Sequence, residues 1–557
     1  MDTTPRDQPD RAPYWPWAGS WRAIVLLAVI VLAARLLYLA FLSPYTLVED
    51  EAHYWEWSRR LDWSYYSKGP GVAWTIAAST RLLGDTEFGI RAPAAVFGFL
   101  LMIGVAGLGA DVARDTRAGF AAALLTLATP MLLVAGLVMT VDMPYLAMWT
   151  LAAWGAWRAM SRGSGPAWIG VGAAIGAGFL FKYTILLLIP GVLVYALTSA
   201  DRRRTARAQW PWLLGAVAIV ALGIAPVAIW NAQHEWVTLR HLLGHLGLSG
   251  GDMPVAEGNG WHYDPRWTLE FIGTQIGLLL FPLLLCVFAI IESIRRRRDD
   301  AERWAGQLFL MCCALPILLV YFLVTFVAAA EGNWAMAAYP TLIALAGWAV
   351  IDTMDVRQPA LRRWRAMDPA ERRARHLRKP RTPRQVAWHL SLGAAMVIAL
   401  GAARIDLLAR IPRLRPFVPI GRFVGADLLA ADVKELIRDA RDDAEHNPGH
   451  LEPIVIAPHY GRASILAFYL PGHPIVYCSS SLMAGRKTQY DFWPETDLRD
   501  MDALAHRPGV LLGGHREDWL PHFGFVSEPM RLEHEPKRDR WAFLAYDYLG
   551  FQREHPP

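Results

Sequence analysis

Residues 49–74, EDEAHYWEWSRRLDWSYYSKGPGVAW, follow the first long apolar segment of the chain and decide how the rest of the sequence is interpreted. This stretch combines three consecutive acids, a band of Trp and Tyr, and a Lys-Gly-Pro turn. Aromatic side chains are enriched at membrane–water interfaces, whereas three carboxylates at that depth need water or a function. We therefore interpret residues 49–74 as the active-site loop of a membrane enzyme.

The composition is that of a polytopic membrane protein. Of the 557 residues, 54% are hydrophobic and 19% are charged, and the apolar residues come in runs of membrane-spanning length. The net charge of +5 arises largely from Arg clusters between these runs, which indicate membrane orientation and lipid-headgroup contacts rather than nucleic-acid binding. Three of the four cysteines fall inside apolar runs and Cys478 stands alone, so the sequence predicts neither a disulfide framework nor a zinc site.

Apolar periodicity predicts about eleven or more transmembrane helices, near 21–43, 91–112, 117–138, 143–160, 166–181, 183–199, 210–230, 268–291, 304–328, 334–352 and 386–408. If the polar N-terminal tail, 1–20, is cytoplasmic, every Arg-rich loop falls on the cytoplasmic side. The acids, histidines and isolated lysines then share the opposite face. We therefore expect a multi-pass protein of the bacterial inner (plasma) membrane, with an active site that faces the periplasm or the exterior.

The first outer loop, 44–90, is predicted to carry two amphipathic interfacial helices, at 52–60 and 70–83. Lys68 precedes the N-terminus of the second helix, where free N–H groups and the helix dipole favour an anion such as phosphate. Before residue 379 the only lysines are Lys68 and Lys182, and Arg is used elsewhere. The compact positive charges of two lysines suit a phosphate in a tight pocket. The alternative is that these lysines occur by chance and only extend their ammonium groups toward the lipid headgroups.

Acids on the outer face are candidates for catalysis. Asp50 and its neighbours Glu49 and Glu51 repel one another beside a hydrocarbon boundary, which raises a carboxyl pKa toward the range of a general base. The alternative is a solvated helix end. Asp142, in the turn MTVDMPYL, is a second acid on the same face, with a helix cap as its alternative role. One carboxylate can take a proton while the other orients a hydroxyl or holds a cation.

Further residues complete the predicted site. Beside Lys68 and Lys182, Arg59 and Arg60 are predicted to contact the bound phosphate. Substrate contacts are predicted for the side chains of Tyr65, Tyr66, His53 and Asn333.

No metal ligand set is predicted. His241 and His245 stand four residues apart and leave a divalent ion possible, together with His234, His262 or Asp264, but no H-E-x-x-H pattern occurs. No cofactor is predicted with certainty.

The segment 410–557 is more polar and is predicted to form a small extracytoplasmic α/β domain. Strands are expected at 452–458, 474–479 and 509–513, with a helix at 462–470. The run 489–494 (QYDFWP) is interpreted as an acceptor-glycan contact or, alternatively, as a core edge of this domain. The predicted division is thus 1–20, a transmembrane domain 21–409 and a C-terminal domain 410–557.

Four short motifs carry a family resemblance: DEAHY at 50–54, KGP at 68–70, TVDMP at 140–144 and FKYT at 181–184. Together they resemble the GT-C superfamily of integral-membrane glycosyltransferases, in the bacterial branch related to protein O-mannosyltransferases and the lipid A aminoarabinose transferase. The resemblance covers about residues 20–350. It implies that Asp50 is the catalytic acid of the first outer loop, that Lys68 contacts the polyprenyl phosphate and that Asp142 is the second acid. The sequence departs from the aminoarabinose-type pattern at Gly69, where Pro is expected.

These observations predict a cell-envelope glycosyltransferase that moves a sugar from a polyprenyl-phosphate-linked donor to a hydroxyl of an extracytoplasmic lipid, glycan or protein. The reaction is expected to be inverting, with Asp50 as general base. The expected partners are this donor, the acceptor and membrane lipid. Two alternatives are a transporter or flippase of lipid-linked sugars and a non-catalytic glycolipid-binding subunit. A transporter should show internal repeats and charged midplane helices, and neither is found in the sequence.

Overall fold

The computed structural model describes residues 15–245, 251, 263–368, 382–413, 421, 423–483, 485–533 and 541–551. The chain divides into two compact units. The first unit contains Met1–Tyr38, Ala94–Pro226 and Glu257–Ala402. The second unit contains Leu39–Pro93, Val227–Ala256 and Ala403–Pro557. The boundaries predicted at residues 20 and 409 stay a prediction.

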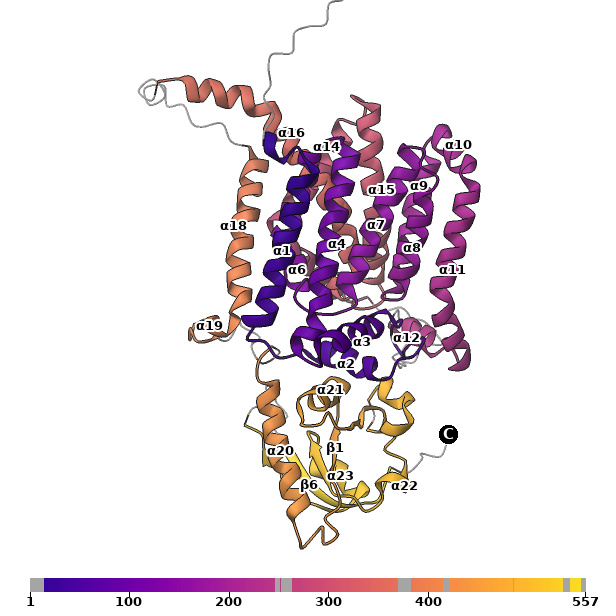
Figure 1. Cartoon of the computed structure of the whole chain (residues 1–557), viewed down its shortest axis with the longest axis vertical. Helices are drawn as coiled ribbons and strands as arrows, with labels where there is room; N and C mark the ends of the chain where they lie inside the picture. The colour runs from indigo at the N-terminus through magenta and orange to yellow at the C-terminus, as the bar shows by residue number, and fades with distance from the viewer. Residues whose placement is uncertain are drawn as a thin grey trace, which may run out of the picture. The chain divides into compact units, whose positions relative to one another are not determined.

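The first unit is a bundle of helices that lie side by side with roughly parallel axes (Figure 1). Long apolar runs form its helices because their backbone groups pair within the helix and their side chains suit a lipid or protein-core environment. The described elements are η1 (Pro16–Ala18), α1 (Trp21–Phe41), α4 (Glu87–Ala113), α5 (Thr116–Ala128), α6 (Pro130–Ala135), α7 (Asp142–Ser161), α8 (Ala167–Phe179), η2 (Tyr183–Leu187), α9 (Leu188–Leu197), α10 (Ala200–Ala208), α11 (Trp210–Gln233), α13 (Pro265–Leu279), α14 (Phe281–Arg295), α15 (Ala301–Val324), η3 (Gly332–Ala338), α16 (Tyr339–Ala366) and α18 (Pro383–Ala403). Of these, α1, α4 and α11 continue into the second unit.

Helices occur at all eleven positions predicted from the sequence, but fewer of them are long enough to be counted as spans. Among the described residues, six helices are long and apolar enough to cross a membrane, and the pair α13 and α14, bent by 103°, makes up to seven. The predicted span at 117–138 is divided into α5 and α6 at Pro130, and that at 183–199 is divided between η2 and α9. The predicted count of eleven is therefore not confirmed.

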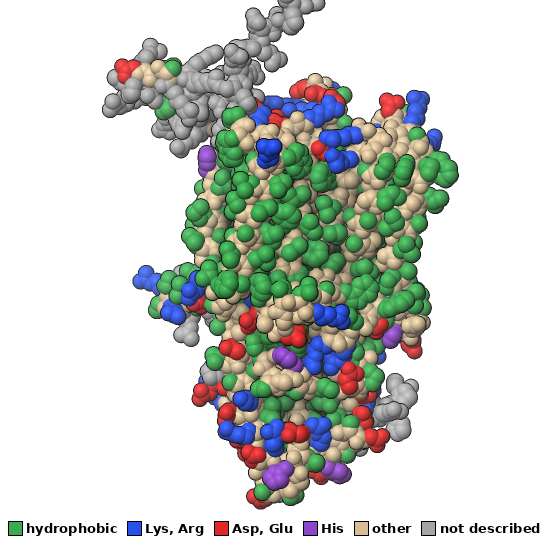
Figure 2. Space-filling model, viewed as in Figure 1, with side chains coloured by type: hydrophobic (Ala, Val, Ile, Leu, Met, Phe, Trp, Pro, Cys, Tyr) green, Lys and Arg blue, Asp and Glu red, His purple; other side chains and the backbone are tan. Residues whose placement is uncertain are grey.

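Basic loops gather at one end of the first unit. Ion pairs join the corresponding helix ends there: Arg114 with Glu302, Arg117 with Asp355, Arg158 and Arg162 with Asp111, Arg303 with Asp352, and Arg384 with Glu292. Figure 2 shows Lys and Arg side chains at this end and hydrophobic side chains along the flanks of the bundle. The predicted segregation of the basic loops at one end is thus confirmed, and their cytoplasmic location stays a prediction.

The second unit combines the first outer loop with the C-terminal segment. Its helices are α2 (Glu49–Arg59), α3 (Gly71–Leu83), α12 (Val237–His245), α19 (Ile405–Ala409), α20 (Ala426–Asp442), α21 (Tyr460–Tyr469), α22 (Met501–Leu504) and α23 (Arg516–Trp519), with short 3-10 turns η6 (Ser480–Leu482), η7 (Gln489–Phe492), η8 (Pro494–Thr496) and η9 (Leu520–His522). Its strands are β1 (Ile454–Ala457), β2 (Val476–Cys478), β3 (Gly509–Leu512), β4 (Phe523–Val526), β5 (Met530–Arg531) and β6 (Trp541–Tyr548).

These strands form one mixed sheet in the order β2-β1-β3-β6-β4, with β5 also paired to β6. Strand β1 is parallel to β2 and β3, while β6 is antiparallel to β3, β4 and β5. The predicted strands at 452–458, 474–479 and 509–513 and the predicted helix at 462–470 are confirmed as β1, β2, β3 and α21. Fully buried residues such as Ile456, Leu511 and Trp519 belong to one apolar cluster of this segment.

Helix α2 packs on α21, so its aromatic side chains belong to a protein core. Trp55 is buried against Phe468, and Trp57 is stacked on Tyr65 with ring centroids 4.4 Å apart. The two helices predicted in the first outer loop are present as α2 and α3. Their predicted interfacial position is not confirmed, because these Trp rings, expected at headgroup level, are covered by protein.

Candidate functional site

The three acids at the start of α2 differ in their environments. Val48 is the N-cap residue, so the acids occupy the first turn, where the helix dipole favours negative charge. Asp50 is exposed, Glu49 is partly exposed and Glu51 is fully buried. Since the helix turns by 100° per residue, consecutive side chains point in different directions. Asp50 is thus the acid of the three that a substrate reaches most directly.

Glu51 is held by a buried ion pair. Its carboxylate accepts hydrogen bonds from Nε and Nη2 of Arg91, at 2.9 and 2.6 Å, and from the backbone N–H of Val48 at 3.2 Å. Arg91 also donates to the carbonyl oxygens of Tyr45 and Thr46, at 2.8 Å each. These contacts fix the start of α2 through Glu51, and the catalytic role predicted for it from the sequence stays a prediction.

The C-terminal segment surrounds the start of α2 with cationic and aromatic side chains. Glu49 lies 3.8 Å from both Nδ1 of His459 and Nη2 of Arg462. Burial raises the pKa of Tyr460 to about 12, and the negative charges of Asp50 and Glu49 act in the same direction. These C-terminal residues were not predicted from the sequence. Their position directly after β1 was the one indication in the sequence, because functional side chains commonly follow the carboxyl ends of parallel strands.

Lys68 lies in a tight turn that leads into α3. Its carbonyl oxygen accepts from the backbone N–H of Tyr65 at 3.1 Å and from the hydroxyl of Ser64 at 3.3 Å. Pro70 is the N-cap residue of α3, so the predicted helix start after Lys68 and Gly69 is confirmed. The turn presents a partly buried Lys side chain beside a helix N-terminus, an arrangement suited to a phosphate.

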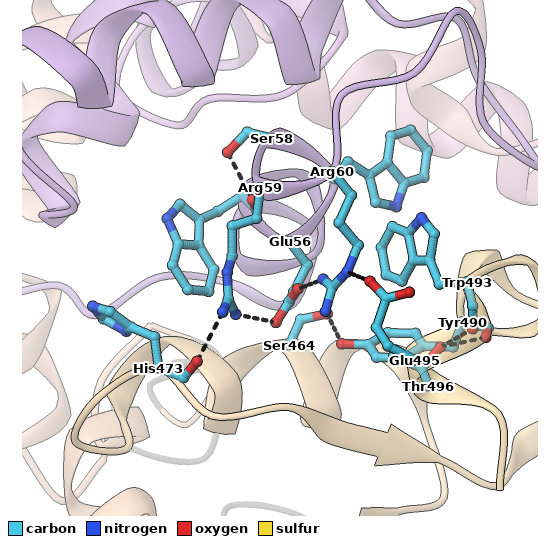
Figure 3. A network of polar contacts seen from close by, with 12 residues as sticks. Glu56, Ser58, Arg59, Arg60, Ser464, His473, Tyr490, Trp493, Glu495 and Thr496 are labelled. Atoms are coloured by element: carbon cyan, nitrogen blue, oxygen red, sulfur yellow. Dashed lines mark hydrogen bonds and ion pairs between the residues drawn. The ribbon is translucent and has the colours of Figure 1, made fainter. Parts of the chain in front are cut away.

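Arg59 and Arg60 connect α2 to the C-terminal segment (Figure 3). Arg59 donates to Glu56 at 3.0 Å and to the carbonyl oxygen of His473 at 2.8 Å. Arg60 pairs with both Glu56 and Glu495. Their guanidinium groups are therefore engaged within the second unit, and the predicted contact with a donor phosphate stays a prediction.

Tyr65 and Tyr66 are buried, and their predicted contact with the substrate stays a prediction. The hydroxyl of Tyr65 lies 3.0 Å from the carbonyl oxygen of Trp57. The backbone N–H of Tyr66 donates to Gln489 at 2.6 Å, and its ring stacks on Phe492. These contacts favour the alternative interpretation of the run 489–494 as part of the protein core.

His53 is enclosed between α2 and α21. Its Nδ1 lies 3.1 Å from the hydroxyl of Ser464, and its Nε2 accepts from Nε1 of Trp57 at 3.1 Å. Burial lowers the pKa of His53 to about 3, and the positive charges of His459 and Arg486 act in the same direction. The imidazole is therefore neutral at physiological pH, and its predicted contact with the substrate stays a prediction.

We expect the stability of the protein to decrease as the pH falls from about 6.5 toward 3. The pKa of His53 is 6.5 when unperturbed and about 3 in the fold, so the unfolded state alone takes up this proton in that interval. Above pH 6.5 both states are neutral and the contribution vanishes. Thermal unfolding in detergent at stepped pH should show a smaller decrease for His53→Gln than for the wild type. The exposed His515→Gln serves as control, and identical pH dependence in all three proteins would contradict the assignment.

Asp142, Lys182 and Asn333 meet in the first unit. Asp142 begins α7, Lys182 precedes η2 and Asn333 lies in η3. The Asp142 carboxylate accepts from Nζ of Lys182 at 2.8 Å and from Nδ2 of Asn333 at 3.1 Å. Lys182 Nζ also lies 5.4 Å from the ring centroid of Tyr145. Three residues predicted independently from the sequence are thus in contact, at the helix ends opposite the basic loops.

The carboxylate of Asp142 holds a cation, as the sequence analysis considered for one of the two acids. Asp142 is not the N-cap residue of α7, because Val141 occupies that position. The predicted convergence of Asp142 with Asp50 and Lys68 stays a prediction.

Metal binding finds little support in the described part of the chain, where no group of three or more His, Cys, Asp or Glu side chains is placed to hold an ion. His241 packs on Tyr66, His234 stacks on Trp230, and Asp264 caps α13. His262 and the side chain of His245 lie outside the described residues.

Comparison with known proteins places this geometry in context. Residues 67–230 match the family described as dolichyl-phosphate-mannose-protein mannosyltransferase. The chain is 30% identical over 311 residues to the lipid A galacturonosyltransferase RgtD of Rhizobium johnstonii, an alignment that covers 54% of this chain and 59% of that protein. It is 25% identical over 399 residues to the undecaprenyl phosphate-alpha-4-amino-4-deoxy-L-arabinose arabinosyl transferase of Pseudomonas savastanoi, covering 61% of this chain and 74% of that protein.

Two solved structures share the fold. ArnT from Cupriavidus metallidurans in the apo state has a TM-score of 0.58 at 18% identity, covering 94% of this chain and 97% of that chain. The same protein bound to undecaprenyl phosphate gives the same TM-score and identity, with coverage of 96% and 100%. Together with the family match and the two relatives, this shared fold confirms the resemblance drawn from the sequence motifs. The chain is thus similar, in its sequence and in its fold, to the GT-C superfamily of integral-membrane glycosyltransferases, in the bacterial branch related to protein O-mannosyltransferases and the lipid A aminoarabinose transferase.

Proposed function

We propose that the protein transfers a sugar, with inversion, from a polyprenyl-phosphate carrier to an acceptor hydroxyl on the outer side of the bacterial inner membrane. The observation that carries the proposal is the difference between the acids of α2. Glu51 is buried in an ion pair and Glu49 faces His459 and Arg462, whereas Asp50 is exposed. The acid in the position implied by the family motif is thus the most exposed of the three.

In this mechanism Asp50 accepts the proton of the acceptor hydroxyl as the hydroxyl oxygen attacks the anomeric carbon of the donor sugar. The bond between that carbon and the phosphate oxygen breaks, and the polyprenyl phosphate leaves with the bonding electrons. Attack from the face opposite the phosphate inverts the anomeric configuration. A lipid-linked donor suits this location, because nucleotide sugars are unavailable outside the cytoplasm.

Phosphate is a competent leaving group that needs charge neutralisation more than a proton. Lys68, next to the N-terminus of α3, supplies one positive charge in the proposed mechanism. Lys182 supplies a second, and Asp142 and Asn333 fix its position. An ammonium held by a carboxylate and an aromatic ring is pre-organised, so it loses little conformational entropy when it contacts the phosphate.

The relatives suggest which substrates to test first. The names of two of them specify lipid A with galacturonic acid, and 4-amino-4-deoxy-L-arabinose carried on undecaprenyl phosphate. We propose lipid A as the first acceptor, and these two sugars, linked to a polyprenyl phosphate, as the first donors.

The decisive experiment reconstitutes the purified chain in vesicles with lipid A and each of the two donors. Mass spectrometry should then detect lipid A whose mass has increased by one sugar residue. The same vesicles report translocation of a labelled donor across the bilayer. Translocation without a modified acceptor would favour the transporter alternative and contradict the proposal.

Replacing Lys182 by Met is expected to lower the rate of transfer roughly tenfold to a hundredfold, because one charge-assisted hydrogen bond to the leaving phosphate is lost. Lys182→Arg keeps the charge and should retain more activity. Initial rates in the vesicle assay measure both variants, and the exposed Lys434→Met on α20 is the control. Equal rates for Lys182→Met and the control would remove Lys182 from the mechanism.

A further inference from the structure

Arg35 is a charged residue inside the apolar helix α1, one of the helices long and apolar enough to cross a membrane. It stands six residues before the end of the helix at Phe41, which corresponds to about 9 Å along the axis. A guanidinium at such a depth is costly unless it meets protein dipoles, water or an anion. Arg35 therefore needs a specific explanation.

Two glycines make room for the Arg35 guanidinium. A Cβ atom added at Gly98 of α4 would lie 2.2 Å from its Nη1, and one added at Gly136, directly after α6, would lie 2.4 Å from its Cζ. Side chains at these positions would occupy the space of the guanidinium. Figure 1 shows α1, α4 and α6 as neighbours in the first unit, and Arg35 lies where these segments meet. A lysine or arginine that merely snorkels toward the headgroups needs no such cradle.

The protein supplies few acceptors to this group. Arg35 Nη2 donates to the carbonyl oxygen of Leu132 at 3.4 Å, a long hydrogen bond, although a guanidinium has five N–H donors. Across the described ranges of the chain, no carboxylate lies within ion-pair distance of Arg35. Arg91 shows the contrast, because it reaches Glu51 and two backbone carbonyls. Arg35 is also only partly buried, so donors remain accessible from outside the bundle.

We propose that Arg35, in the cradle of Gly98 and Gly136, binds the phosphate group of a membrane lipid. A guanidinium fork matches two phosphate oxygens, and a lipid-borne phosphate is the anion available beside a transmembrane helix. The phosphate comes either from a polyprenyl phosphate or from an anionic phospholipid of the bilayer. This site uses neither Asp50 nor any of the residues assigned to sugar transfer, so it can be tested independently of the proposed function.

Native mass spectrometry of the full-length protein in neutral detergent tests the proposal. The protein is titrated separately with undecaprenyl phosphate, with phosphatidylglycerol and with uncharged undecaprenol. Arg35→Gln is expected to weaken binding of at least one phosphate lipid about tenfold or more, while undecaprenol binding stays unchanged. The lipid whose binding is lost identifies the source of the phosphate.

Glycine variants separate a binding role from a folding role. Gly98→Ala and Gly136→Ala keep the arginine but displace its guanidinium, so they should reproduce the loss. Gly170→Ala in α8 is the matched control, because an added Cβ there meets nothing within 4 Å. Retained affinity for both phosphate lipids in Arg35→Gln would overturn the proposal. An equal loss of undecaprenol binding would do so as well, since it would indicate an apolar groove rather than a phosphate site.

Discussion

Asp50→Asn is expected to lower the rate of sugar transfer by about a hundredfold to ten-thousandfold, the usual contribution of a general base. The amide has nearly the same shape as the carboxylate but cannot accept the proton of the attacking hydroxyl. Asp50 is exposed at the start of α2, so this exchange leaves no buried charge without a partner and the protein should fold normally. Initial rates with a labelled polyprenyl-phosphate sugar measure the loss, and binding of the donor is measured separately.

The neighbouring acid gives the matched control. Glu49→Gln changes the same charge one residue earlier in the helix, but Glu49 is only partly exposed and lies near His459 and Arg462. We expect a smaller decrease for Glu49→Gln and partial activity for Asp50→Glu, which keeps a base at a shifted position. Full activity of Asp50→Asn would place the base elsewhere. A loss of donor binding that equals the loss of rate would assign Asp50 to binding instead.

The sequence predicted the elements of the fold better than their grouping. Runs such as EPIVIAP at 452–458 predict a strand because local apolar patterning determines a buried strand, and β1 confirms it. The antiparallel strand β6 was missed, although WAFLAYDY at 541–548 alternates in burial over part of its length. The association of the first outer loop with the C-terminal segment in one unit depends on contacts between residues about 400 positions apart, which one sequence does not reveal.

Within the site, the sequence predicted which residues share one face of the protein, but not which of them form hydrogen bonds or ion pairs with one another. Lys182 and Asn333 were placed on the face of Asp142 by counting spans, and the structure brings the three into contact. The three acids of α2 could not be ranked from the sequence, because their environments depend on remote partners. Arg91 determines the role of Glu51 from another helix. Arg59 and Arg60 were predicted to bind phosphate because their partners within the protein could not be seen in the sequence. Glu495, which pairs with Arg60, lies far along the chain.

The ion pair between Glu51 and Arg91 leads to the largest expected effect on stability. Arg91→Met leaves the Glu51 carboxylate buried without its cation and is expected to lower the free energy of unfolding by about 3–5 kcal/mol. The carbonyl oxygens of Tyr45 and Thr46 lose their donor as well. Denaturant-induced unfolding in mixed micelles, compared between variant and wild type, measures the difference.

A second substitution distinguishes a structural from a catalytic Glu51. The double variant Glu51→Met with Arg91→Met replaces both charges by apolar side chains of similar length, so it should regain much of the stability lost in Arg91→Met. If Glu51 only fixes the start of α2, the folded double variant retains sugar transfer, because Asp50 keeps its position and its carboxylate. Loss of transfer in a double variant with near-normal stability would instead restore the catalytic role that the sequence predicted for Glu51. Activity is lost when one member of a helix-orienting buried pair is mutated, and also when a proton-accepting acid is mutated. The single variants therefore cannot distinguish a structural from a catalytic role of Glu51.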